Sequence, residues 1–308
     1  MISVCIPVYN FKIGDLLNQL VFLLQRAKIE YEIIVAEDAS EPLFAENNFK
    51  AAENCLARYI YLKKNIGRSA IRNYLCKEAN YPNLLFLDCD SVIITENFIS
   101  NYISCLNKNI VVYGGTKYYA QKPETKYLLH WNYGSKREIK PVTVRNKYPA
   151  QYFKTNNFLI PKTILINHPF NEQLKGYGHE DTLMGLELSQ FNIPVYHIDN
   201  PVLHAGLESN DQFIFKTQES IRNLLIIREK VDFQGINKHF KLLEVLSKIQ
   251  ELHLVGVIRI IYWLSRPLLL FLVINFYLMK IFDFYKLGFL CSIYKKSTAL
   301  LNDAFSGK

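Results

Sequence analysis

Two aspartates, Asp88 and Asp90, stand one residue apart directly after the apolar run from Leu84 to Leu87. Because successive side chains on an extended strand point to opposite faces, the two carboxylates are expected to share one face. Oxygen ligands of this kind suit a hard divalent cation that bridges nucleotide phosphates. The pattern therefore predicts a cation site, and the alternative is a strand that ends in a polar turn.

A second pair of carboxylates, Glu180 and Asp181, follows the loop from Gly176 to Gly178 and precedes a helical pattern. Glycine lets the backbone turn tightly, and negative charge is favoured at a helix N-terminus. One interpretation is a helix cap. The other is catalytic, with one acid accepting the proton of a substrate hydroxyl while the other holds the substrate. An aspartate that is already ionised near neutral pH needs no unusual environment for that role.

Four further side chains could bind an anion, a nucleoside or a metal. Arg68 and Arg72 are four residues apart on a predicted helix, so both can reach one anion, although a surface ion pair is an alternative for Arg68. Asp38 follows an apolar run and can accept a hydrogen bond from uracil or ribose, or else form an Asx turn. His204 can be a metal ligand or a structural histidine.

Short apolar runs alternate with helical patterns through the first hundred residues. This alternation indicates an α/β fold with a mostly parallel sheet and helices on both faces. The runs predicted to be strands are Ile2 to Val8, Glu32 to Ala36, Tyr59 to Leu62 and Leu84 to Leu87. Ligands bind such sheets at the carboxyl ends of the strands, where the chain has Tyr9-Asn10, Glu37-Asp38, Asn65 to Gly67 and Asp88 to Asp90.

From Gly114 to Tyr152 the chain is polar and rich in aromatic residues, and its rings are Tyr118, Tyr119, Tyr127, Trp131 and Tyr133. Aromatic rings can stack on the apolar face of a pyranose, so this segment could line a sugar-binding face. An irregular packed insertion is the equal alternative. Beyond it the sequence predicts that regular structure resumes from Phe153 to Pro161, followed by a helix from Thr182 to Gln190 and a strand from Val195 to Ile198.

From Met1 to Gly206 the order of these motifs resembles the family 2 glycosyltransferases of the GT-A fold, and the second half resembles the galactosyltransferase-type variant. The motifs are Ile6-Pro7-Val8-Tyr9-Asn10, Glu37-Asp38-Ala39-Ser40, Asn65-x-Gly67 with Arg72-Asn73, Asp88-x-Asp90, Gly176-Tyr177-Gly178-His179-Glu180-Asp181 and His204. The chain departs from the family pattern at Glu37, where aspartate is more usual. It also departs at His179, where a small residue is common, and this change could alter the acceptor pocket.

The resemblance implies a Rossmann-like mixed sheet and the transfer of a hexose (galactose, glucose or an N-acetylated equivalent) from a nucleotide sugar, expected to be UDP-linked. It implies that Asp90 contacts a divalent cation most directly, with Asp88 nearer the ribose or a metal-bound water. His204 would complete the metal shell. The expected cation is Mn²⁺, because imidazole suits Mn²⁺ better than Mg²⁺. Mg²⁺ is the alternative. The residues expected to bind the nucleotide sugar are Pro7, Tyr9, Asn10, Asp38, Asn65, Gly67, Arg72 and Asp88.

The resemblance also assigns the second acid pair, with Asp181 as the base and Glu180 as an acceptor contact. Direct in-line attack with a single base inverts the anomeric configuration. Two other classes of function stay in view: a sugar nucleotidyltransferase, which also uses an Asp-x-Asp-like metal site, and a catalytically inactive membrane scaffold. The second acid pair disfavours the nucleotidyltransferase, and the intact carboxylates disfavour the scaffold.

The net charge of +8 is concentrated near the C-terminus, where residues 252–308 have seven Lys or Arg and two Asp. These cations interrupt the most apolar part of a chain that is 50% hydrophobic, so we expect a membrane surface as partner and no nucleic acid. The six cysteines form no C-x-x-C pair and are expected to be reduced core residues. The N-terminus has no basic segment or cleavage site, which favours the cytosol.

The sequence predicts three parts: a catalytic GT-A domain (1–210), amphipathic helices packed on it (211–251) and a basic, apolar, membrane-associated tail (252–308). The longest uncharged run in the tail, Pro267 to Met279, has 13 residues and is shorter than the roughly 20 of a spanning helix. Interfacial attachment through 252–296 is therefore expected, with a buried helix pair or a tilted or re-entrant insertion as alternatives. The protein would lie on the cytoplasmic face of the cell membrane, peripheral or monotopic, and act on a glycan or lipid-linked acceptor in surface polysaccharide or glycolipid synthesis.

Overall fold

The structure, a computed structural model, describes residues 1–106, 108–230 and 236–305, without the side chains of residues 230, 236, 238 and 295–305. The backbone divides into two compact units, which are described separately. Unit 1 comprises Met1–Gln121, Gly134–Lys175 and Glu180–Leu207, and unit 2 comprises Lys122–Tyr133, Gly176–His179 and Glu208–Lys308.

Unit 1 is built on a mixed sheet whose strands, in chain order, are β1 (Ile2–Val8), β2 (Tyr31–Asp38), β3 (Arg58–Leu62), β4 (Asn83–Leu87), β6 (Val111–Tyr113), β8 (Asn157–Pro161) and β9 (Val195–His197). Their spatial order is β3-β2-β1-β4-β8-β6-β9. β1 pairs in parallel with β2 and β4, β2 with β3, and β6 with β9. β8 is antiparallel to both of its neighbours, so its N-terminal end lies beside the carboxyl end of β4.

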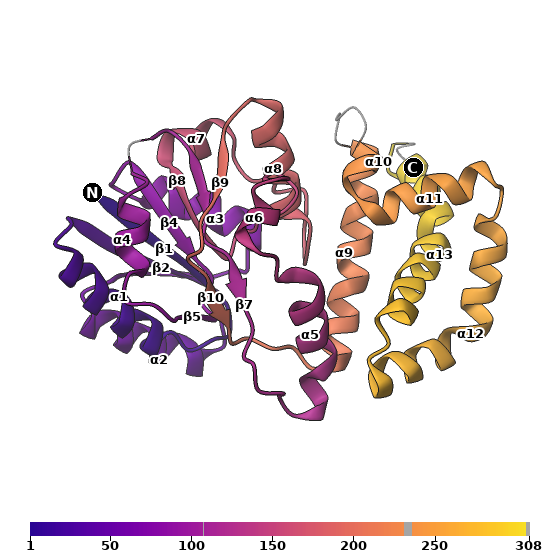
Figure 1. Cartoon of the computed structure of the whole chain (residues 1–308), viewed down its shortest axis with the longest axis horizontal. Helices are drawn as coiled ribbons and strands as arrows, with labels where there is room; N and C mark the ends of the chain where they lie inside the picture. Colours follow the sequence, from indigo (N-terminus) through magenta and orange to yellow (C-terminus); the bar gives the residue numbers. More distant parts are fainter. Residues whose placement is uncertain (107, 231–235, 306–308) are drawn as a thin grey trace. The chain divides into compact units, whose positions relative to one another are not determined.

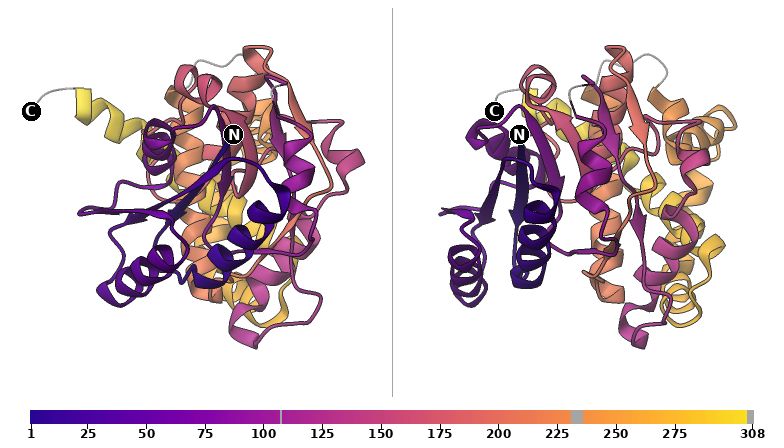
Figure 2. Two further views of the ribbon diagram at one scale, coloured as in Figure 1. Left: turned by 90° about the vertical axis from the view of Figure 1, so that its left-hand side faces the viewer. Right: turned by 60° about the vertical axis from the view of Figure 1, so that its left-hand side comes forward.

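Helices cover both faces of this sheet (Figures 1 and 2). Alternation along β1 places Val4 in one apolar cluster and Cys5 in the other. The helices of the first cluster are α1 (Gly14–Ala27), α2 (Pro42–Asn54) and α4 (Phe98–Ile103), and those of the second are α3 (Arg68–Glu78), α7 (Lys162–Asn167) and α8 (Glu180–Gln190). Because both faces are covered, the polar side chains of the sheet gather where the strands end.

A small second sheet positions the predicted metal ligand His204. Its strands are β5 (Ser91–Ile93), β7 (Thr116–Lys117) and β10 (Val202–His204), in the order β5-β10-β7. β10 runs antiparallel to β5, and His204 lies opposite Ser91, directly after the Asp-x-Asp segment. The pairing therefore brings a residue from far along the chain to the end of β4.

Buried polar side chains fix the segment that leads into β10. The Tyr102 hydroxyl donates to Asn157 Oδ1 (2.6 Å), and Asn157 Nδ2 donates to the Asn200 carbonyl (2.9 Å). Asn200 Nδ2 in turn donates to the Phe98 carbonyl (2.9 Å). Since these side chains are buried, each hydrogen bond replaces one that water would otherwise make.

The aromatic segment folds as short pieces: the 3₁₀ helix η1 (Thr125–Tyr127), α5 (Leu128–Tyr133), the π-helix η2 (Gly134–Glu138) and α6 (Val142–Arg145). Tyr118 is buried, and within unit 2 the Tyr133 ring contacts those of Phe213 and Phe282, with centroids 5.4 and 5.9 Å away. For these two rings the packed-insertion interpretation therefore fits better than a sugar-binding face.

Unit 2 is helical, with α9 (Asn210–Lys230), α10 (Ile236–His239), α11 (Lys241–Glu251), α12 (Val255–Phe276) and α13 (Met279–Phe305). Within the described residues, α12 is long and apolar enough to cross a membrane by length and composition. It extends beyond the predicted uncharged run at its N-terminal side because the helix also includes Arg266 and Arg259. Arg259 donates from Nε and from a terminal nitrogen to the Cys291 carbonyl of α13, at 3.1 and 2.9 Å. A hydrogen-bonded arginine can thus lie within an apolar hairpin.

The predicted fold class, a mostly parallel α/β sheet followed by a helical region, is confirmed. Within the predicted ordered segment 153–161 the strand β8 begins at Asn157, and the amphipathic helices predicted for 211–251 are found as α9, α10 and α11. The boundaries at 210 and 251 stay predictions, and residues 306–308 of the tail lie outside the described part of the chain. All six cysteines are free; Cys5, Cys76 and Cys291 are buried, and the others are partly exposed.

We predict that Tyr102→Phe lowers the free energy of unfolding by about 1–3 kcal/mol, because Asn157 Oδ1 keeps its buried position and loses its donor. Urea unfolding followed by circular dichroism measures the change. The matched control is Tyr148→Phe, which removes a hydroxyl from a side chain that is 58% exposed and should change stability by less than about 0.5 kcal/mol. Equal effects of the two substitutions would contradict the structural role of the buried network.

Candidate active site

The two carboxylates of the Asp-x-Asp segment do not share a face of a strand, and that prediction is wrong. β4 ends at Leu87, and the backbone turns there, with the Ser91 amide donating to the Asp88 carbonyl at 3.1 Å. The Asp88 amide still donates to the Asn156 carbonyl of the segment before β8, at 3.0 Å. The turn sends Asp88 and Asp90 toward different partners.

Asp88 lies against the two arginines of α3. Arg72 donates to Asp88 Oδ1 at 2.7 Å, and Arg68 lies 3.4 Å from Oδ2. The Arg72 side chain is only 2% exposed, and its guanidinium carbon lies over the Phe170 ring, 5.8 Å from the ring centroid. The two arginines do reach one anion, as their spacing predicted, and in the structure that anion is the Asp88 carboxylate.

The same arginines reach Glu180 at the start of α8. Arg68 Nε donates to Glu180 Oε1 at 2.8 Å, and an Arg72 nitrogen lies 3.9 Å from that oxygen. Glu180 is 7% exposed. One carboxylate from each acid pair is thus neutralised by one pair of cations, which brings the two motifs together at one edge of the sheet.

Asp90 pairs with His204, whose Nδ1 lies 3.2 Å from Asp90 Oδ2. Burial disfavours the ionised form of Asp90, but the neighbouring imidazole outweighs it and lowers the pKa of this carboxyl. Burial would likewise lower the pKa of His204, yet the Asp90 carboxylate raises it to about 9. Both shifts favour an ion pair between the two side chains near neutral pH.

The backbone at Gly206 passes close over the same carboxylate. A Cβ built on Gly206 would overlap the Asp90 carboxylate and lie 2.9 Å from the Asp90 Cβ. The Ala205 amide donates to the Asp90 carbonyl at 2.9 Å, which fixes this approach. Gly206 therefore leaves the space that the Asp90 side chain occupies.

The donor atoms present fit a divalent cation in part. Across residues 1–106, 108–230 and 236–305, no three His, Cys, Asp or Glu side chains are placed to hold one metal ion. Asp90 and His204 are close enough to act together, whereas Asp88 faces the arginines. Because Mg²⁺-type sites often take one or two protein carboxylates and complete their shell with substrate phosphates, the Asp90–His204 pair suits a cation that arrives with a nucleotide.

Asp38 holds the loop that precedes α3. Its Oδ1 accepts from the Ile66 amide at 2.7 Å, and its Oδ2 accepts from the Gly67 amide at 3.0 Å. Asn65 Nδ2 donates to the Asp38 carbonyl at 3.1 Å. Burial raises the pKa of Asp38 although both amides favour its ionised form. Asp38, Asn65 and Gly67, all predicted nucleotide contacts, are thus connected to one another by hydrogen bonds.

The N-terminal motif lies next to the Asp38 segment. Asn10 has a positive φ of 50°, its amide donates to Ser40 Oγ at 2.7 Å, and its Oδ1 accepts from the Glu41 amide at 2.8 Å. Tyr9 is 55% exposed, and Pro7 is partly exposed. Their side chains are accessible at the carboxyl end of β1, where the sequence predicted a nucleotide contact.

Lys154, which the sequence did not single out, lies beside the predicted base. Its ammonium is 2.7 Å from Asp181 Oδ2, while Asp181 Oδ1 accepts from the Thr182 amide at 2.6 Å. Burial would lower the pKa of Lys154, but the Asp181 and Glu138 carboxylates raise it well above its ordinary value. The sequence signal for Lys154 was weak: a polar residue directly after apolar Phe153, which indicates only that the two side chains point in different directions.

The glycines of the Gly176-x-Gly178 loop serve packing within unit 2. Gly176 and Gly178 have φ of 74° and 98°, and a Cβ on either would lie less than 3 Å from α9 side chains, Glu219 and Ser220 respectively. His179 also has a positive φ, 71°, and its ring meets that of Phe240 edge-on at 5.2 Å. These contacts account for the residue types in this loop.

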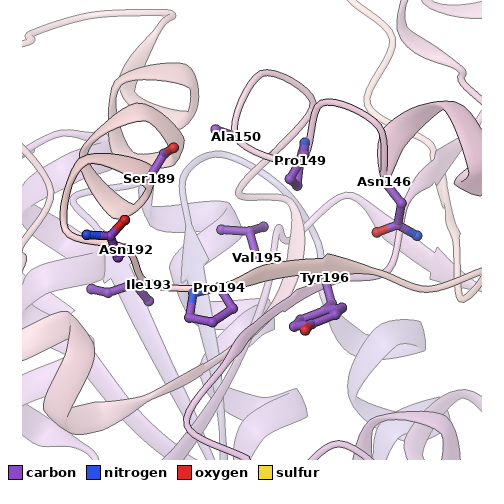
Figure 3. A pocket seen from close by; sticks show the side chains of 9 residues that line it. All are labelled: Asn146, Pro149, Ala150, Ser189, Asn192, Ile193, Pro194, Val195 and Tyr196. Carbon is purple, nitrogen blue, oxygen red and sulfur yellow. The ribbon is translucent and has the colours of Figure 1, made fainter.

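Figure 3 shows a pocket of about 670 Å³ whose lining includes none of these side chains. Ser189 and Asn192 line it at the C-terminal end of α8, whereas Glu180 and Asp181 begin that helix. Its full lining is Asn146, Pro149, Ala150, Ser189, Asn192, Ile193, Pro194, Val195 and Tyr196. Because this lining contains no carboxylate, histidine or cation, the acid pairs are the better candidate for the active site.

Solved structures resemble this chain in fold, although no curated protein matches it by sequence. Mannosyltransferase PcManGT from Pyrobaculum calidifontis, solved with GDP-Man and Mn²⁺, superposes with a TM-score of 0.54 at 10% identity, covering 100% of this chain and 88% of that one. Glucosyl-3-phosphoglycerate synthase from Mycobacterium tuberculosis, solved with Mn²⁺, UDP and glucosyl-3-phosphoglycerate, gives 0.50 at 14% identity over 76% of this chain and 82% of that one.

S. aureus TarS also gives a TM-score of 0.50, at 20% identity over 76% of this chain, which spans only 40% of the length of TarS. At such identities the likeness shows the GT-A fold. The family assignment comes from the sequence: the model of Glycosyl transferase family 2 matches residues 3–175, more than half of the chain. The chain belongs to glycosyl transferase family 2 and is a glycosyltransferase.

Proposed function

We propose that the protein is an inverting, metal-dependent hexosyltransferase that takes its sugar from a UDP-linked donor. The observation that supports this best is the link between the two acid pairs through Arg68 and Arg72 in unit 1. This link brings the Asp-x-Asp segment, which would face the donor phosphates, and the acid pair of α8 to one edge of the sheet. A transferase needs both there, because the leaving phosphate and the attacking hydroxyl meet at one carbon.

Asp181 is the base in this proposal, and Glu180 contacts the acceptor. The Asp181 side chain is 16% exposed and Glu180 is 7% exposed, so Asp181 is the more accessible of the two. Glu180 Oε1 is also engaged by two arginines, which suits a fixed acceptor contact. A single base that accepts the proton during in-line attack inverts the anomeric centre.

Asp90 and His204 would hold the cation, with Asp88 nearer the ribose. A bound divalent cation would neutralise the charge that develops on the leaving diphosphate. Arg72 orients Asp88 for its role, and Asp38 holds the loop from Asn65 to Gly67 that would face the nucleoside. The Mn²⁺ with GDP-Man or UDP in two structures of similar fold supports a divalent cation and a nucleotide sugar here.

The acceptor is proposed to be a glycan or lipid-linked hydroxyl at the cytoplasmic membrane face, in surface polysaccharide or glycolipid synthesis. Support comes from α12, on which Ile260, Leu264, Leu268 and Phe271 form one exposed stripe at helical spacing, each 55–68% exposed. Arg266 and Lys280 are exposed nearby, whereas Arg259 is bound to α13 and Lys286 pairs with Asp283. The side chains of Lys295 and Lys296 lie outside the described part. The apolar stripe, more than the basic residues, is the proposed membrane contact.

The first test is transfer from a panel of nucleotide sugars, with Asp181→Asn as the decisive variant. We expect turnover to fall by about 100-fold or more while nucleotide affinity stays nearly unchanged, because a positioned base contributes on that order. Steady-state rates and calorimetric UDP binding give the two quantities. Turnover close to wild type would move the base elsewhere, and absence of transfer or hydrolysis with every donor would contradict the proposed reaction.

Metal dependence is the second expectation. Activity should be lost in EDTA and restored better by Mn²⁺ than by Mg²⁺, because imidazole suits Mn²⁺. Gly206→Ala should weaken Mn²⁺-dependent nucleotide binding by about tenfold or more, since an added methyl group must displace the Asp90 carboxylate. Mn²⁺ titrations of nucleotide binding measure this.

The matched control is Gly256→Ala, because a Cβ there meets nothing within 4 Å. It should leave the titration unchanged. Full transfer in metal-free buffer would contradict metal dependence, and unchanged Mn²⁺ binding in Gly206→Ala would contradict the assignment of Asp90.

Membrane attachment is the third expectation. Full-length protein should co-sediment with anionic liposomes, and Ile260→Glu combined with Leu264→Glu and Leu268→Glu should lower that affinity by about 100-fold or more, because each buried side chain of this size contributes about 1.5–3 kcal/mol. Leu56→Glu is the control, since Leu56 is 94% exposed in unit 1. Wild-type protein that stays in the supernatant, or a triple variant that binds as well as wild type, would contradict the membrane role; dimers lost in the variant would assign the stripe to a second copy.

A further inference from the structure

We propose that Lys154 is a positioning residue for the base: its ammonium orients the Asp181 carboxylate for proton transfer from the acceptor. The inference rests on the proposed function and deepens it at the same site. The defining contact is the 2.7 Å ion pair between Lys154 Nζ and Asp181 Oδ2.

The backbone fixes where Lys154 points. Phe153 is fully buried, with its ring 5.3 Å from that of Phe158, and Thr155 is 4% exposed. The lysine between them is directed outward, with its side chain 41% exposed. The Asn156 carbonyl accepts from the Asp88 amide, so the segment is also tied to the end of β4. Because its neighbours are packed, the backbone at Lys154 is already fixed, and only the side chain must be ordered when it holds a carboxylate.

Asp181 is held at both oxygens. Thr182 donates to Oδ1 from its amide at 2.6 Å and from its hydroxyl at 3.1 Å, and Lys154 lies at Oδ2. A carboxylate oxygen has two lone-pair positions, so Oδ2 can accept a proton while it stays in contact with the ammonium. These contacts fix the plane of the carboxylate, which is the geometric requirement for a base that must meet a hydroxyl within hydrogen-bond distance.

The charges around this pair come from three elements. Glu180 precedes Asp181 on α8 and is paired with Arg68 and Arg72 of α3. Glu138 of the π-helix η2 acts on Lys154 and favours its charged form. Lys154 is thus kept as a cation, and Glu180 is neutralised by other cations. The arrangement favours an ionised Asp181 in a fixed orientation.

The experiment is a double-mutant cycle on the full chain. Lys154→Met should lower kcat by about tenfold or more with the KM for the donor unchanged, because a misplaced base loses rate and not donor affinity. Lys154→Arg keeps the cation and should recover most of kcat. In an Asp181→Asn background, Lys154→Met should have no further effect, since residues that act as one unit are not additive. Lys147→Met, at an exposed lysine of the same unit, is the matched control and should behave as wild type.

The pH profile is the second readout. Loss of the cation should move the acidic limb of kcat to higher pH in Lys154→Met, because the ionised carboxylate is no longer favoured. An unshifted limb, additive losses in the cycle, a raised donor KM or failure of Lys154→Arg to recover rate would each overturn the proposal. Failure of the proposed function looks different, because Asp181→Asn alone would then keep its turnover.

Discussion

The bridge between Arg68 and Arg72 and the carboxylates of Asp88 and Glu180 is the interaction on which the rest of the site depends. Two acid pairs gathered at one edge of a sheet repel one another unless cations lie between them. The arginines bind one acid from each pair and leave Asp90 to His204 and Asp181 to Lys154. The bridge therefore sorts four acids of similar chemistry into different roles.

A nearly buried guanidinium such as Arg72 is stable only where its charge is compensated in place. The start of α3 must then be fixed, and Asp38 does this by accepting hydrogen bonds from the two amides that precede the helix. The predicted nucleotide contacts at Asp38 and Gly67 consequently have a structural function of their own. A substitution at Asp38 is therefore expected to displace the start of α3, and with it Arg68 and Arg72, in addition to removing any ligand contact.

The sequence predicted the first four strands to within one or two residues at each end, because each is a compact apolar run followed by polar residues. Helical spacing predicted that Arg68 and Arg72 could reach one anion, and the resemblance added that Arg72 binds the nucleotide sugar; in the structure both arginines lie against Asp88. It did not predict that Asp88 and Asp90 diverge, because a turn three residues long has no periodicity to read. The sequence analysis related Gly176 and Gly178 to the tight loop before the second acid pair. In the structure both have a positive φ and leave space for side chains of α9.

The direction of β8 determines where Lys154 lies, and the sequence does not predict that direction. An apolar strand has the same pattern whether it runs parallel or antiparallel, so the position of its first residues stays undefined until the sheet is known. Because β8 is antiparallel to β4, the residues before it lie at the carboxyl edge with Asp88. A parallel β8 would have placed Lys154 at the opposite edge, away from Asp181. Because β8 is reversed, Lys154, which holds the proposed base Asp181, and Asp88 lie at neighbouring ends of β8 and β4. The distance between the two motifs is therefore set by the sheet and not by a mobile loop.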